Sequence, residues 1–140
     1  MDKVLFDTDI VLDLLLDREP FSEFAAKVFA LAETNQIQGF ITPVICANLY
    51  YILQRNASHE NVIEKLSQLL IILDVIAMDR QTVINALISD FKDFEYALQN
   101  FAAIHSVSIN IILTRNIKDY KKSSLSIMTP ENYLSLKSIS

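Results

Sequence analysis

The sequence predicts an α/β fold: a three-layer α/β/α sandwich with a central, mainly parallel sheet. Short apolar segments alternate with longer amphipathic ones along the chain, which is the pattern of strands connected by helices. The first segment, Val4 to Phe6, is continuously apolar, as in a parallel strand that is buried on both faces. The chain has 140 residues, of which 51% are hydrophobic and 21% charged, so it is long enough for a well-buried core. We therefore expect a single domain over residues 1–140.

The predicted elements of the N-terminal half begin and end at residues with a clear backbone preference. Pro20 ends a first helical region, and the region after it carries the apolar stripe of an amphipathic helix. Gly39 marks the turn into a short strand, and Pro43 suits the first turn of the next helix. Ser58, with Glu60 close behind it, starts a further helix. In order, the elements are strand 3–6, helix 10–16, helix 21–32, strand 39–42, helix 43–55 and helix 58–70.

The C-terminal half continues the same alternation. Asp79 is a good residue type to cap a helix. Residues 109–113 form the clearest strand because β-branched residues dominate them. His105 lies on the apolar stripe of its helix, which favours a core histidine over a ligand. In order, the elements are strand 74–77, helix 81–89, helix 92–105, strand 109–113, strand 126–128 and helix 131–137.

Acidic and amide side chains lie where predicted strands end or helices begin. The three groups are Asp7 with Asp9, Asp90 with Asp93 and Glu95, and Asn116 with Asp119. If the strands before the first and last groups are neighbours, the groups converge at the carboxyl edge of the sheet, where open α/β folds bind ligands. Mg²⁺ and Mn²⁺ prefer carboxylate oxygens and water, so such a cluster favours a divalent metal site. The alternative is that each acid only stabilises the start of a helix.

Net charge bears on the class of partner. The formal charge of −5 is unusual for a protein that binds nucleic acid through clustered bases. An enzyme that binds phosphate through metal ions instead needs acids, which the cations neutralise. A local group of basic residues lies beside the third acidic group. These residues either bind RNA or simply belong to a loop exposed to solvent. We expect this group to contact RNA: Arg115, Lys118, Lys121 and Lys122.

Other chemistries and locations are disfavoured. The single glycine, Gly39, is too few for a phosphate-binding loop. Cys46 is the only cysteine, which rules out a disulfide within the chain and favours the cytoplasm. The most apolar run, residues 69–77, is nine residues long and contains Asp74, so we expect no membrane span.

Several segments together resemble the PIN domain family. They are residues 7–13, 49–53, 90–99, 114–120 and, more weakly, 128–131, in this order along nearly the whole chain. The resemblance implies an α/β/α sandwich and Mg²⁺- or Mn²⁺-dependent cleavage of single-stranded RNA. Bacterial members of this kind are often VapC-type toxins paired with an antitoxin protein, and many form dimers, so an antitoxin partner and a homodimer are also expected.

The resemblance assigns roles residue by residue. Asp7 matches the first metal ligand of the family. The chain departs from the family pattern at Asn48, where a glutamate is usual, at Tyr96, where an aspartate is usual, and near Asn116. The catalytic set implied is Asp7, Asp93, Glu95 and Asn116, with Asp7, Asp93 and Asn116 as metal ligands. Accessory positions are Asp9, Asn48, Tyr96 and Asp119.

Two other functions are compatible with parts of the sequence. The departures at Asn48 and Tyr96 are the evidence for a PIN-like domain that has lost catalysis and binds RNA or a partner. Residues 6–13 also resemble the first motif of haloacid dehalogenase-like phosphatases. The glycine that usually follows the second aspartate of that motif is missing, as is a later Gly-Asp pair, so this second alternative is the weaker.

Overall fold

The structure is a computed structural model that describes residues 1–106 and 108–139. One five-stranded sheet in the order β3-β2-β1-β4-β5 forms its centre, and every pair of neighbouring strands is parallel. The strands are β1 (Lys3–Phe6), β2 (Gln38–Ile41), β3 (Leu73–Val75), β4 (Ile111–Leu113) and β5 (Ser126–Met128). The predicted α/β class and parallel sheet are therefore confirmed.

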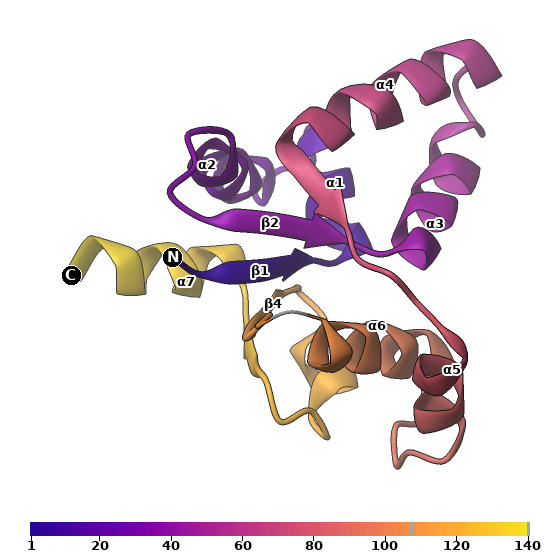
Figure 1. Cartoon of the computed structure of the whole chain (residues 1–140). Helices are drawn as coiled ribbons and strands as arrows, with labels where there is room; N and C mark the ends of the chain where they lie inside the picture. The colour runs from indigo at the N-terminus through magenta and orange to yellow at the C-terminus, as the bar shows by residue number, and fades with distance from the viewer. Residues whose placement is uncertain (107, 140) are drawn as a thin grey trace.

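Helices cover both faces of the sheet and complete the three layers. They are α1 (Thr8–Leu15), α2 (Ser22–Glu33), α3 (Pro43–Leu53), α4 (His59–Ile72), α5 (Arg80–Leu87), α6 (Phe94–His105) and α7 (Pro130–Ile139), with a short 3₁₀ helix η1 (Ile117–Tyr120). In Figure 1, α1 to α4 lie above the sheet and α5 with α6 below it. Helix α7 packs against α2. Within the described residues, no helix is long and apolar enough to cross a membrane.

Local sequence signals explain most of these elements. Val4, Leu5 and Phe6 of the central strand are fully buried, as their continuous apolar run predicts. The predicted capping residues also act as caps: the Ser58 side chain accepts a hydrogen bond from the Asn61 backbone N–H, and Asp79 accepts one from Thr82. Helix η1 was not predicted, because its residues lack an apolar period.

The prediction for His105 was wrong. His105 is exposed, and its ring contacts the side chain of Asn85 in α5. The buried residues of α6 are Ala97, Gln99, Asn100, Ala102 and Ala103. Ala102 and Ala103 belong to the hydrophobic core, whereas the polar Gln99 and Asn100 are buried by contacts with Thr42 and Ser123. The spacing of apolar residues along α6 therefore could not reveal its whole buried face.

Gly39 also has a role that differs from the predicted turn. It lies inside β2, pairs with Val4 and Leu73, and is buried. A Cβ atom built on it would collide with the Leu73 side chain and crowd that of Phe6. A side chain at this position is therefore excluded by close packing between the strands.

We expect Gly39→Ala to lower the free energy of unfolding by about 1–3 kcal/mol, the usual range for overpacking a core. Leu73 can shift only partly, because it is itself buried. Urea unfolding of the wild type and of Gly39→Ala measures the difference. Unchanged stability of Gly39→Ala would mean that the strands can separate here without cost.

Candidate active site

The central strands bring two loops together at the carboxyl edge of the sheet. β1 lies between β2 and β4. After β1 the chain adds β2 and β3 on one side of this strand, and then β4 and β5 on its other side. This reversal is the position at which open α/β sheets form a ligand crevice. Asp7 and Asp9 follow β1, and residues 114–116 follow β4, so Asn116 of the third group meets the first group at this edge, whereas Asp119 does not.

Asp7 is held at the end of β1 by hydrogen bonds from three directions. Its Oδ1 accepts from the Thr8 backbone N–H at 2.8 Å, and its Oδ2 accepts from the Thr114 hydroxyl at 2.9 Å and the Tyr120 hydroxyl at 3.1 Å. Burial and then the nearby Asp9 charge raise the pKa of Asp7 to about 7, despite these hydrogen bonds. A cation beside Asp7 would favour its charged form.

Asp9 stands on the first turn of α1 and faces the loop after β4. Its Oδ2 accepts hydrogen bonds from the Arg115 backbone N–H at 2.8 Å and the Asn116 side-chain amide at 3.4 Å. Its Oδ1 is buried and has no hydrogen-bond partner among residues 1–106 and 108–139. Burial raises the pKa of Asp9 as well. A buried carboxylate oxygen without a partner is unusual in proteins and calls for a compensating group.

Helix α6 supplies the opposite wall through Glu95 and Tyr96. The Glu95 carboxylate accepts a hydrogen bond from the Asn48 side chain of α3, and the Tyr96 hydroxyl accepts one from Asn116 at 3.1 Å. Below them the buried Gln99 accepts a hydrogen bond from Thr42, which caps α3, at 2.6 Å. This buried contact holds α6 against the start of α3.

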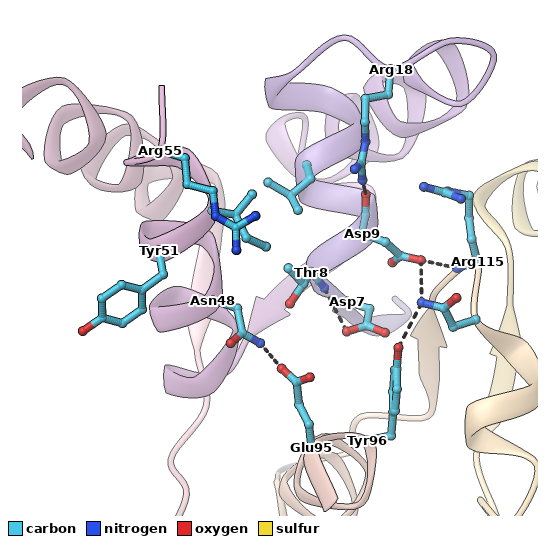
Figure 2. A pocket seen from close by; sticks show the side chains of 13 residues that line it. Asp7, Thr8, Asp9, Arg18, Asn48, Tyr51, Arg55, Glu95, Tyr96 and Arg115 are labelled. Atoms are coloured by element: carbon cyan, nitrogen blue, oxygen red, sulfur yellow. Dashed lines mark hydrogen bonds between the residues drawn. The ribbon is translucent and has the colours of Figure 1, made fainter. Parts of the chain in front are cut away.

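A cavity of about 490 Å³ lies between these walls. Figure 2 shows Asp7 and Glu95 near its centre, with Asp9 and Tyr96 on the side of the β4 loop. The cavity is lined by Asp7, Thr8, Asp9, Leu12, Arg18, Asn48, Tyr51, Ile52, Arg55, Glu95, Tyr96, Arg115 and Asn116. Five of the predicted catalytic and accessory positions besides Asp7 therefore share one cavity: Asp9, Asn48, Glu95, Tyr96 and Asn116.

Asp93 and Asp119 do not line this cavity. Asp93 is exposed and caps α6 by accepting a hydrogen bond from the Tyr96 backbone N–H at 3.2 Å. Both acids line a separate hollow of about 210 Å³, together with Asp90, Phe91, Lys92, Lys118, Lys121 and Lys122. The structure thus brings Glu95, rather than Asp93, to Asp7.

Arg115, predicted to contact RNA, is bound by a buried carboxylate. Asp13, on the second turn of α1, has a side chain that is 1% exposed. Arg115 donates to it from Nε at 2.8 Å and from a terminal nitrogen at 3.0 Å, and Arg18 donates from Nε at 2.9 Å. The Arg115 guanidinium also lies 3.8 Å from the centre of the Phe21 ring. These contacts fix the loop that carries Asn116.

The donor set fits a hard divalent cation. Asp7, Asp9, Glu95 and Asn116 offer oxygen atoms of the kind that Mg²⁺ and Mn²⁺ bind, and the unpartnered Asp9 Oδ1 is one of them. In the part of the chain that the structure describes, however, no three acidic, histidine or cysteine side chains are grouped closely enough to hold a metal by themselves. Such a site needs amide or water oxygens to complete the coordination of the ion.

Several residues at this site were not assigned a role from the sequence. Tyr120 is fully buried in η1 and donates to Asp7, and a lone aromatic among the lysines of residues 117–122 was its only signal. Asp13 could have been found as an acid among the apolar residues of α1. Tyr51 lies in the family-like segment 49–53 but had no role assigned to it, and nothing in the sequence marked the cavity-lining positions of Arg18 and Arg55.

The fold and the cavity define the class of protein: an α/β/α domain with an acidic site at the carboxyl edge of a parallel sheet. A family model described as PIN domain matches residues 3–118. The chain therefore belongs to the PIN domain family, as its motifs predicted. This membership removes the haloacid dehalogenase-like alternative.

Solved structures that share this fold include two VapBC proteins. One is VapBC2 from Rickettsia felis bound to a DNA fragment from the promoter, with a TM-score of 0.61 and 18% identity over 90% of this chain and 96% of that chain. The other is VapBC-1 from nontypeable Haemophilus influenzae, with a TM-score of 0.66 and 15% identity over 92% of this chain and 98% of that chain. A comparison with curated protein sequences gives no match.

Proposed function

We propose that this protein is a Mg²⁺- or Mn²⁺-dependent endoribonuclease that cleaves single-stranded RNA. The observation that carries the proposal is the cavity at the carboxyl edge of a PIN-family sheet, where Asp7 and Asp9 meet Asn116 and Glu95. Buried carboxylates without a compensating charge are costly, and a bound cation removes that cost.

Asp7, Asp9 and Asn116 are the proposed ligands. Both carboxylates keep acceptor capacity, because Asp7 Oδ1 accepts one hydrogen bond and Asp9 Oδ1 accepts none within the part of the chain that the structure describes. The bound ion supplies Lewis acidity, which lowers the pKa of a water molecule and stabilises the charge that develops on a phosphodiester. Thr114 and Tyr120 hold the Asp7 carboxylate in one orientation, as hydrogen-bonding partners behind ligands usually do.

Glu95 is proposed to accept a hydrogen bond from the attacking water across the cavity. Burial and the charge of Asp93 raise the pKa of Glu95, which favours proton uptake during the reaction. Asn48 binds the same carboxylate and orients it. In this proposal Asp93 acts as the cap of α6 and not as a ligand.

The biological context is also part of the proposal. The two structural neighbours are VapBC proteins, and VapC-type toxins act with an antitoxin. We therefore propose that this chain is the toxin of such a pair, that it works in the cytoplasm and that it forms a homodimer.

The deciding experiment incubates the purified protein with labelled single-stranded RNA, with Mn²⁺ or with EDTA. We expect cleavage with Mn²⁺ that EDTA stops and that Asp7→Asn abolishes. Asp17→Asn is the matched control, because Asp17 is exposed and does not line the cavity. Equal cleavage by wild type and Asp7→Asn would assign the activity to a contaminant.

A catalytically inactive, RNA- or partner-binding domain is the second candidate. Tyr96 favours it, because the phenol fills the side of the cavity next to Asn116 where the family usually has an aspartate. If wild type does not cleave, we expect Tyr96→Asp to create Mn²⁺-dependent cleavage by adding a fourth acid to the cavity, beside Asp7, Asp9 and Glu95. Isothermal titration with Mn²⁺ measures the accompanying gain in affinity, and Tyr96→Asn controls for loss of the ring.

A further inference from the structure

RNA is a polyanion, so the acidic cavity needs cationic groups that are free to contact phosphate. Three arginines line the cavity: Arg18, Arg55 and Arg115. Asp13 forms ion pairs with Arg18 and Arg115, and this neutralises part of their charge and fixes their side chains. Among residues 1–106 and 108–139, no carboxylate forms an ion pair with Arg55.

Arg55 is also placed to reach a bound strand. It follows the C-terminal end of α3 in an exposed turn, where its backbone N–H donates to the Ile52 carbonyl at 3.4 Å. Figure 2 shows its guanidinium directed towards the middle of the cavity. A phosphate beside Asp7 or at the adjoining nucleotide is therefore the kind of anion that Arg55 can bind.

Tyr51 lines the rim of the cavity on the side of Arg55, and Figure 2 shows its ring directed outward from the cavity. It lies four residues before Arg55 on the last turn of α3, and it is 63% exposed. The Tyr51 and Tyr50 rings form a T-shaped pair, with their centroids 5.2 Å apart and their planes at 90°. The Tyr50 hydroxyl is in turn hydrogen-bonded to His59 Nδ1 at 2.9 Å. An exposed ring with a supported position loses little entropy when a base stacks on it.

We propose that Tyr51 and Arg55 form a binding subsite for one nucleotide of single-stranded RNA next to the cleavage site, with Tyr51 stacking on the base and Arg55 contacting a phosphate. The inference rests on the proposed ribonuclease function. An aromatic ring beside a free cation is the arrangement by which proteins bind single strands without reading their sequence. A duplex does not fit, because its bases are already stacked on each other.

The test measures binding of a short, fluorescently labelled single-stranded RNA by anisotropy in Mg²⁺, in an Asp7→Asn background that does not cleave. We expect Arg55→Ala to weaken RNA binding at least about fivefold. The slope of the logarithm of the binding constant against the logarithm of the salt concentration should fall in magnitude by about one, which corresponds to the loss of one phosphate contact. Tyr51→Ala should weaken binding at least about fivefold with unchanged salt dependence, while Tyr51→Phe keeps the affinity. Lys65→Ala, at an exposed position of α4 that does not line the cavity, is the matched control.

The outcomes separate this inference from the function on which it rests. If Tyr51→Ala and Arg55→Ala bind RNA as Lys65→Ala does, the subsite is wrong, whereas the nuclease proposal is unaffected. If the Asp7→Asn protein binds no RNA and wild type does not cleave it, both proposals are wrong. Circular dichroism of each variant identifies any loss of binding that comes from unfolding, and for such a variant Tyr51→Leu or Arg55→Gln replaces it in the same assay.

Discussion

Asp7→Asn is expected to lower RNA cleavage by more than about a hundredfold, since loss of a residue that only supports a metal ligand already costs about 10–100-fold. The same substitution is expected to stabilise the metal-free protein at about pH 8. The stabilisation follows from the pKa of Asp7, which burial and the Asp9 charge raise from 3.8 to about 7. An amide of the same shape carries no charge, so it avoids the cost of burying the ionised carboxylate.

The pH dependence has a definite sign. Between about pH 4 and pH 7 the folded protein holds a proton on Asp7 that the unfolded chain releases. The wild-type free energy of unfolding therefore falls as the pH rises through this window, whereas the Asp7 contribution is absent from Asp7→Asn. The full shift corresponds to about 4 kcal/mol at most, and we expect about half of it, or roughly 5–10 °C in Tm, because the substituted amide cannot accept all three hydrogen bonds.

Thermal unfolding of both proteins in EDTA, at about pH 5 and about pH 8, measures this effect. The Tm of Asp7→Asn should exceed that of wild type clearly at the higher pH and only slightly at the lower pH. Mg²⁺ should then raise the Tm of wild type more than that of Asp7→Asn, because a ligand that binds the folded state stabilises it. An Asp7→Asn protein that is less stable than wild type at about pH 8 would contradict the argument.

Asp13→Asn is expected to give the second large effect, a loss of about 2–3 kcal/mol in the free energy of unfolding. Breaking a fully buried ion pair costs about 3–5 kcal/mol. The cost is smaller here because the side chains of Arg18 and Arg115 are 37% and 30% exposed and can reach water. An isosteric amide keeps the packing but removes the charge that holds both arginines.

The same change should lower the rate of RNA cleavage more than the affinity for RNA. Arg115 donates its backbone N–H to Asp9, so a displaced Arg115 loosens Asp9 and the neighbouring Asn116. We expect a lower kcat and weaker Mn²⁺ binding, with KM for RNA nearly unchanged. Asp17→Asn, which removes an exposed charge from the turn after α1, should change neither stability nor kcat. A wild-type kcat in Asp13→Asn would show that Asp13 is structural only.

Local sequence patterns predicted most of the fold. The buried run Val4 to Phe6 became the central strand, and residues such as Ser58 and Asp79 began helices as expected. These signals are local, because a strand depends on its own apolar residues and a helix cap on a backbone group three residues away. His105 in α6 was an exception, because burial along that helix depends on contacts with other elements, such as those of Gln99 with Thr42 and of Asn100 with Ser123.

The site was predictable only in part, for the same reason. The sequence alone determined that Asp7 ends a strand of a PIN-like sheet and that acids and amides follow a second strand. Only the tertiary structure decided which of them meet: it turned Asp93 back onto its own helix and brought Glu95 to Asp7. It also paired Arg115 with Asp13, 102 residues earlier in the chain, and buried the Tyr120 hydroxyl against Asp7. Such contacts depend on how helices pack across the sheet, and residue spacing along one helix or strand carries no information about them.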